Sequence, residues 1–256
     1  MMTQFIKNKI RSIVKRFGFD IVKTYPAIKA RYKTDKPLKI EFVGVSGAGK
    51  TTLFKQLVKS RTKKDNWLPI EQFLAHCEKQ DRKKESKEPH LKLLELKTKR
   101  IFARRDYSMF TKMGLLSFFY ENLKKDRILY KHNKNYKVLW HDGITHNYSA
   151  DFVELYSQNK ESAAALFENT AVVYFNSSNN AVTKNIIKRQ RQSGQIRPQH
   201  KNLTQEELTA KAEQSLLKKQ EVLKVIKEHN VPVLEIDASE KLAENVRKVR
   251  HFINGL

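Results

Sequence analysis

The residues with the most specific chemistry in this sequence lie between Gly44 and Thr51, where the chain reads GVSGAGKT. The segment fits G-x-x-x-x-G-K-[ST] at each fixed position, and it stands between an apolar run and a helical pattern. Glycines let backbone N–H groups approach phosphate oxygens, Lys50 can reach the β- and γ-phosphates, and the Thr51 hydroxyl can ligate Mg²⁺. A glycine turn that binds nothing is the alternative. We predict a site for ATP (or GTP) and Mg²⁺ formed by Gly44, Ser46, Gly47, Ala48, Gly49, Lys50, Thr51 and Thr52.

A second candidate is Asp142, which follows the short apolar run from Tyr136 to Trp140. A carboxylate at the end of such a strand can hold Mg²⁺ together with Thr51, or act as a base toward an acceptor hydroxyl. A turn aspartate placed before Gly143 is the alternative interpretation.

Two histidines, His141 and His146, flank Asp142 and suggest a transition-metal site as another reading. Neighbouring residues of a strand point to opposite faces. We therefore predict that His141 and Asp142 do not chelate a metal together.

A third candidate is the basic segment of residues 188–200, which begins KRQRQSGQIR. Arg189 shares one helical face with the apolar Val182 and Ile186, so it follows the predicted buried stripe toward the strand ends. We predict a lid that closes on the site, excludes water and brings Arg189 and Arg191 to the transferring phosphate. A basic surface loop in a lysine-rich protein is the alternative.

The elements that must position these residues alternate along the chain. Apolar runs at residues 40–45, 136–140, 171–175 and 231–236 are separated and followed by helical patterns, and a further short strand is predicted within 67–73. This order predicts an α/β fold with three layers, a P-loop NTPase fold with a mostly parallel five-stranded sheet. Ligands of such sheets bind at the carboxyl ends of the strands, where Gly44–Thr51, Asp142 and Asn176 all fall.

We expect residues 61–135 to build the acceptor site. They contain a charge run at 79–88, a helical pattern over 91–101 and an aromatic segment from Met109 to Tyr130. Within that segment, four apolar side chains predict a buried helix: Leu115, Phe118, Phe119 and Leu123. Arg104 and Arg105 are predicted to bind an anionic acceptor, with plain surface charge as the alternative.

The charge of the chain is strongly positive: 51 Lys and Arg against 27 Asp and Glu give a net charge of +24. Such an excess predicts an anionic partner. Residues 3–25 combine apolar and basic positions at helical spacing, which predicts an N-terminal amphipathic helix. The more common role of such a helix is to pack its apolar stripe on the core, and the other is contact with an anionic membrane surface. Residues 1–37 form this segment and a linker, and residues 38–256 form the P-loop domain.

The cellular compartment is predicted from what the sequence lacks. One cysteine excludes an internal disulfide. No run reaches the ~20 apolar residues that span a bilayer, and no secretory signal opens the chain. We expect a cytoplasmic protein, peripheral at the inner face of the membrane.

Several segments resemble the nucleoside and nucleotide kinase group of P-loop proteins, which includes thymidylate, adenylate and adenylylsulfate kinases. They are GVSGAGKTT, VLWHDG, VVYFNSSNNAVTKNIIKRQRQSG and VPVLEIDAS. The resemblance covers residues 38–253 and implies a five-stranded parallel core and transfer of phosphate from ATP·Mg²⁺. The chain departs from the group after the third strand, where Gly143-Ile144-Thr145 stands in place of an Asp-Arg pair. The opening of the chain resembles the lead-ins of bacterial surface-glycan biosynthesis proteins.

We therefore predict a small-molecule kinase, an ATP- and Mg²⁺-dependent phosphotransferase that acts on a hydroxyl or phosphate in surface-glycan or nucleotide metabolism. Its predicted catalytic residues are Lys50, Asp142, Arg189 and Arg191. The alternative is a nucleotide-binding module or ATPase that docks on an anionic membrane surface or, less in keeping with the pattern, on nucleic acid. A transporter-type ATPase is disfavoured because the chain has no LSGGQ-like signature.

Overall fold

The fold is built on one five-stranded sheet. A computed structural model describes residues 38–62, 64–77, 88–133, 135–193 and 203–256. The strands are β1 Leu38–Val43, β2 Trp67–Pro69, β3 Lys137–Trp140, β4 Thr170–Asn176 and β5 Val233–Asp237. They lie in the order β2-β3-β1-β4-β5, and every neighbouring pair is parallel. The predicted amphipathic helix at 3–25, the linker that follows it and the charge run up to residue 87 lie outside the described residues.

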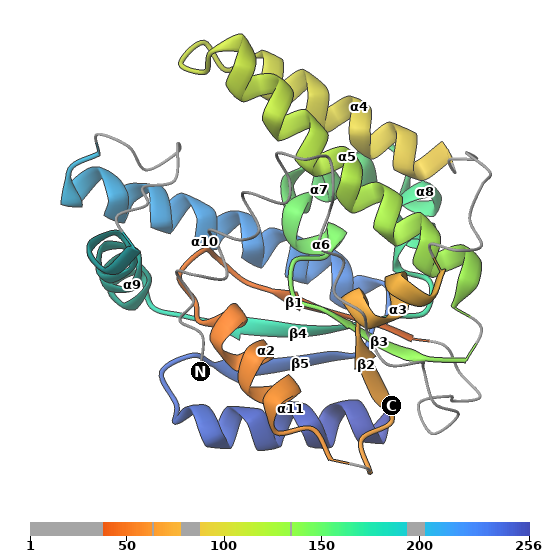
Figure 1. The fold of residues 1–256 in the computed structure, drawn as a ribbon. Helices are drawn as coiled ribbons and strands as arrows, with labels where there is room; N and C mark the ends of the chain where they lie inside the picture. The colour runs from red at the N-terminus through yellow and green to blue at the C-terminus, as the bar shows by residue number, and fades with distance from the viewer. Residues whose placement is uncertain (1–37, 63, 78–87, 134, 194–202) are drawn as a thin grey trace, which may run out of the picture.

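Helices cover both faces of the sheet, as predicted. They are α2 Lys50–Lys59, α3 Ile70–Cys77, α4 Glu88–Phe102, α5 Met109–His132, α6 Ile144–Asn147, α7 Ser149–Gln158, α8 Lys160–Phe167, α9 Asn179–Ser193, α10 Gln205–Glu228 and α11 Leu242–Gly255. In Figure 1, α2 and α11 lie below the sheet, and α4 to α8 lie above it. The three-layer α/β architecture is therefore confirmed.

The central strand β1 contributes side chains to both layers. Ile40 and Phe42 pack in the core between the sheet and the helices α2 and α11, whereas Val43 belongs to the core on the opposite face of the sheet. Successive side chains of a strand point to opposite faces. A parallel sheet covered on both sides therefore needs apolar residues at nearly every position of its central strands, which explains the apolar runs in the sequence, although Glu41 interrupts that of β1.

The edge strand β2 confirms the short strand predicted within 67–73 and takes up its first three residues. It pairs only with β3 and ends at Pro69, and α3 begins at the next residue. Proline has no N–H to continue the ladder, but it is compatible with the start of a helix.

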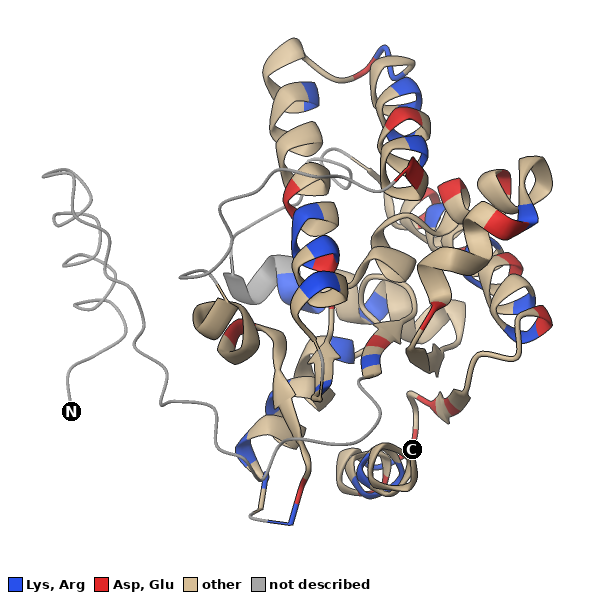
Figure 2. Ribbon diagram, turned by 90° about the vertical axis from the view of Figure 1, so that its right-hand side faces the viewer, with Lys and Arg blue, Asp and Glu red and all other residues tan. Residues whose placement is uncertain are grey.

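The prediction of a buried helix at 109–130 holds only for the second half of α5. Leu123 is buried, but Phe118 is 50% exposed and Leu115 is partly exposed. In Figures 1 and 2, α4 and α5 form a hairpin whose connecting loop projects beyond the sheet. The first half of α5 is exposed because it lies in this projection. Within the described part of the chain, no helix is long and apolar enough to cross a membrane.

Candidate active site

The phosphate loop joins β1 to α2, at the carboxyl end of the central strand. Gly47 and Gly49 have φ angles of +95° and +86°, in the left-handed region that favours glycine. A Cβ atom on Gly47 would lie 3.0 Å from the Val182 carbonyl oxygen, so the loop also packs closely against α9. Gly49 caps α2, and the N-terminus of a helix favours an anion through its N–H groups and its dipole.

Lys50 is held against this loop. Its residue is 6% exposed, and its Nζ donates to the carbonyl oxygens of Gly44 and Val45 at 2.9 and 2.8 Å. The ammonium group therefore already lies at the loop where a phosphate would sit.

A cleft of about 530 Å³ opens at this end of the sheet. The residues that line it come from the phosphate loop, the turn after β3 and helix α9: Ser46, Gly47, Gly49, Lys50, Thr51, Thr52, Asp142, His146, Asn185, Lys188 and Arg189. Of the predicted nucleotide-binding residues, only Gly44 and Ala48 do not line the cleft. Ala48 is buried in the core, and Gly44 packs against Phe175.

Helix α9 contributes two side chains that contact the phosphate loop. The Arg189 guanidinium donates to the Ser46 Oγ at 3.2 Å, and Asn185 Nδ2 donates to the Gly47 carbonyl oxygen at 2.8 Å. Val182 and Ile186 of the same helix are buried, which places Arg189 over the loop as the helical spacing predicted. The side chain of Arg191 and the remainder of the predicted lid, from residue 194, lie outside what the structure describes.

Asp142 lies in the turn after β3, with its carboxylate half-exposed between two histidines. His141 Nε2 lies 3.2 Å from Asp142 Oδ2, and His146 Nε2 lies 3.9 Å from Oδ1. The prediction that His141 and Asp142 point apart is wrong, because β3 ends at Trp140 and the alternation of a strand does not extend into the turn. Among the described residues, no group of three or more His, Cys, Asp or Glu side chains is arranged to hold a metal.

Beside this turn lies a buried ionic network that no sequence motif indicated. Glu41 Oε2 accepts the Thr145 N–H at 2.8 Å, and Oε1 lies 2.9 Å from Lys39 Nζ. Lys39 also contacts Asp126 at 2.6 Å, and Asp126 contacts His90 at 2.8 Å. Burial raises the pKa of Glu41 although Lys39 opposes the shift. Burial alone would raise the pKa of Asp126, but Lys39 and His90 hold it below its ordinary value.

Lys219 of α10 is another buried charged residue that no sequence motif indicated. Its Nζ donates to the Ser149 Oγ at 2.6 Å and to the carbonyl oxygen of His146. Burial, reinforced by the charges of Lys50 and Lys97, lowers the pKa of Lys219 well below that of an ordinary lysine. Lys219 thus ties α10 to the segment that follows Asp142.

The sequence does carry a signal for both residues. Glu41 interrupts the apolar run IEFV, and Lys219 lies seven positions after Ala212 on the apolar stripe of α10. A charged residue at a core position indicates a buried polar network. The sequence does not show which partners it has.

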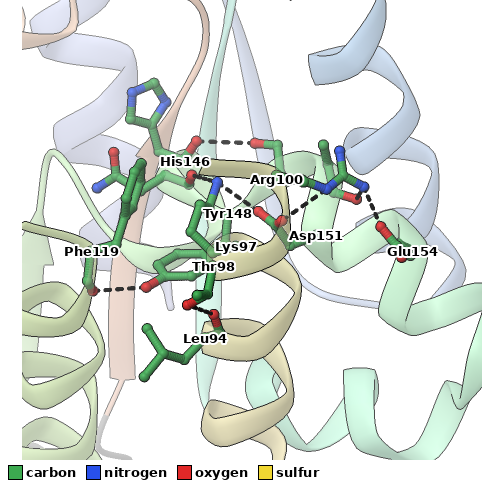
Figure 3. Close-up of polar contacts among 12 residues, drawn as sticks. Leu94, Lys97, Thr98, Arg100, Phe119, His146, Tyr148, Asp151 and Glu154 are labelled. Atoms are coloured by element: carbon green, nitrogen blue, oxygen red, sulfur yellow. Dashed lines mark hydrogen bonds and ion pairs between the residues drawn. The ribbon is translucent and has the colours of Figure 1, made fainter. Parts of the chain in front are cut away.

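Figure 3 shows how α4 is attached to the same segment. Lys97 and Arg100 converge on the buried carboxylate of Asp151 in α7, at 2.6 and 3.1 Å. Lys97 also donates to the Asn147 carbonyl oxygen at 2.9 Å, and Arg100 pairs with Glu154 as well. Burial lowers the pKa of Lys97 although Asp151 opposes the shift. Helices α4 and α7 are therefore fixed beside the Asp142 turn.

The two arginines that were predicted to bind the acceptor, Arg104 and Arg105, lie outside the lining of the cleft. Arg104 binds Asp106 through two contacts of 2.8 and 2.6 Å, and its guanidinium lies over the Tyr107 ring at 4.6 Å. Both Arg104 and Arg105 belong to the loop between α4 and α5. Neither is among the described residues that line the cleft.

The strand order, the all-parallel sheet and the phosphate loop between β1 and α2 define a three-layer fold of the P-loop NTPase class. The chain matches no known family model and no curated protein sequence. Among solved structures it is similar to a shikimate kinase from Bacteroides thetaiotaomicron, with 14% sequence identity, a TM-score of 0.42, and coverage of 84% of this chain and 98% of that chain. Membership of the thymidylate, adenylate and adenylylsulfate kinase group stays a prediction.

Proposed function

We propose that this chain is an ATP- and Mg²⁺-dependent phosphotransferase that acts on a hydroxyl or phosphate group of a small molecule. The observation that carries the proposal is the convergence of three groups in one cleft: the phosphate loop with Lys50, the carboxylate of Asp142 and the guanidinium of Arg189. Phosphoryl transfer depends mainly on positioning and on charge stabilisation, and this cleft contains groups suited to both.

The residues present fit a nucleotide and its metal ion. Gly47 and Gly49 have the left-handed backbone that a phosphate-cradling loop requires, and the cleft is large enough for a small ligand. Thr51 and Asp142 supply hydroxyl and carboxylate oxygens, which are the ligands that Mg²⁺ prefers. When bound, Mg²⁺ would neutralise charge on the phosphate oxygens.

In the proposed reaction, an acceptor oxygen forms a bond to the γ-phosphorus of ATP, the bond to the β–γ bridging oxygen breaks, and ADP leaves. Lys50 and Arg189 stabilise the charge on the phosphate oxygens. Where the acceptor is a hydroxyl, Asp142 accepts its proton if the carboxylate is not occupied with the metal ion. We place the acceptor beside the Asp142 turn, within reach of residues 61–135, and Arg191 in the lid that closes over it.

The test is a transfer assay with γ-labelled ATP and Mg²⁺ against a panel of nucleosides, nucleotides, sugars and glycolipid precursors. Lys50→Ala and Asp142→Ala serve as inactive variants, and Lys184→Gln, an exposed residue of α9 outside the cleft lining, serves as the matched control. We expect label on one acceptor class, its loss in both inactive variants and its retention in the control. ATP binding with no labelled acceptor, and with hydrolysis no faster than in the variants, would contradict the proposal and favour a nucleotide-binding module.

A further inference from the structure

The end of α4 and the first turns of α5, on either side of the loop that joins them, carry large apolar side chains that the rest of the described chain does not cover. We define the hairpin tip as residues 99–113. Within it, Phe110 is 89% exposed, Met109 62%, Met113 53% and Phe102 40%. In Figures 1 and 2 this tip projects from the body of the protein. Several large exposed apolar residues gathered at a projection indicate an interaction surface, whereas single exposed ones need no explanation.

The hairpin tip is also basic. It contains one acidic residue, Asp106, against five basic ones: Lys99, Arg100, Arg104, Arg105 and Lys112. Asp106 is already bound by Arg104, and this contact lowers the pKa of Asp106 to about 2. Lys99 and Arg100 pair with Glu95, Asp151 and Glu154 outside the tip. Arg105 and Lys112 have no acidic partner in an ion pair between described residues, although Lys112 Nζ donates to the Phe102 carbonyl oxygen at 3.0 Å, so no described carboxylate compensates these two charges. The hairpin tip therefore combines exposed apolar side chains with positive charge that no described carboxylate compensates.

We propose that the hairpin tip docks on an anionic lipid surface. Phe110 and Met109 would enter the boundary between headgroups and acyl chains, while Arg105 and Lys112 contact the anionic headgroups. A second copy of this chain would carry the same net charge of +24, so repulsion opposes self-association through this surface. Nucleic acid would satisfy the arginines but would not cover the methionines and Phe110. A lipid surface satisfies both features.

This docking surface is separate from the cleft. None of the residues of the hairpin tip lines the cleft, so the inference does not depend on phosphate transfer. In Figure 1 the tip lies on the same side of the view as the ends of the strands where the phosphate loop is found.

The direct test places a fluorophore at the tip of the full chain. Phe110→Trp introduces an exposed indole, whereas Trp67 and Trp140 are 0% and 3% exposed and give a background that lipid should not change. The probe is a vesicle of phosphatidylcholine with about one third phosphatidylglycerol, compared with phosphatidylcholine alone. We expect the emission of the variant to shift to shorter wavelength, and to be quenched by brominated acyl chains, in the anionic vesicles only.

A second measurement separates the hairpin tip from residues 1–37. The double variant Met109→Ser/Phe110→Ser should lower partition into the anionic vesicles about tenfold or more. Leu217→Ser on α10 removes an apolar residue that is 56% exposed outside the tip and should leave partition unchanged. If the Phe110→Trp variant binds vesicles without a shift in its emission, the proposal is overturned in favour of binding through residues 1–37. Absence of vesicle binding, or dimers that depend on Phe110 in sedimentation, would overturn it as well.

Discussion

The carboxylate of Glu41 accepts a hydrogen bond of 2.8 Å from the backbone N–H of Thr145, across 104 positions of sequence. Glu41 belongs to β1, whose end carries the phosphate loop, and Thr145 lies in α6, the short helix that follows the Asp142 turn. One buried side chain therefore fixes the distance between the phosphate-binding loop and the carboxylate that faces it.

Gly143→Ala should break the Glu41–Thr145 contact. A Cβ atom on Gly143 would lie 2.1 Å from Glu41 Oε2, so the buried carboxylate must shift. We expect a loss of roughly 1–3 kcal/mol in the free energy of unfolding, measured by urea denaturation. Gly114→Ala is the control, because a Cβ atom there meets nothing within 4 Å. Gly114 lies inside α5, so this change should stabilise by about 0.5–1 kcal/mol. Equal stability of the two variants would show that Glu41 does not fix the turn.

Arg189→Gln should lower the rate of phosphate transfer more than it lowers nucleotide affinity. The Arg189 guanidinium lies 3.2 Å from Ser46 Oγ at the mouth of the phosphate loop, where it can stabilise charge on the transferring group. Loss of one such donor costs about a hundredfold or more in rate. Turnover assays and equilibrium binding of a non-hydrolysable ATP analogue would separate the two effects. A similar loss in the exposed control Lys184→Gln would show that the effect is not specific to Arg189.

Asp142→Asn should raise the Mg²⁺ concentration required for half-maximal activity. The substitution keeps the shape of the side chain and removes the charge that attracts the cation. We expect a shift of about tenfold or more in the Mg²⁺ dependence, with partial recovery at high Mg²⁺. A rate that falls equally at every Mg²⁺ concentration would instead assign Asp142 to proton transfer. Asp106→Asn, in the hairpin tip, is the matched control.

Lys219 should make the free energy of unfolding increase as the pH rises into the alkaline range. The pKa of Lys219 in the folded chain lies well below the ordinary value of 10.5. Between these two values the unfolded chain binds more protons than the folded chain, so the contribution of Lys219 to stability increases as the pH rises. The free energy of unfolding of the unmodified protein should therefore rise relative to that of Lys219→Met between neutral pH and about pH 10.

The control for this pH dependence is Lys224→Met, an exposed lysine on α10. Its unfolding free energy should follow that of the unmodified protein at every pH. Parallel pH profiles for Lys219→Met and the unmodified chain would show that Lys219 does not carry the depressed pKa.

The sequence by itself determined the features that depend on contiguous residues. The phosphate-loop motif could be recognised because all of its positions, Lys50 and Thr51 included, lie in a single run of residues, and the alternation of strands and helices predicted the parallel sheet. The position of Arg189 also followed from local spacing, because helical periodicity relates it to the buried Val182 and Ile186.

Only the tertiary structure decided which distant side chains meet. Glu41 and Thr145 are 104 positions apart, and Lys219 and Ser149 are 70 positions apart. The exposure of the hairpin tip likewise depends on how far α4 and α5 extend beyond the sheet. Periodicity shows which residues share a face of an element, but the partner of that face is set by the packing of the whole chain.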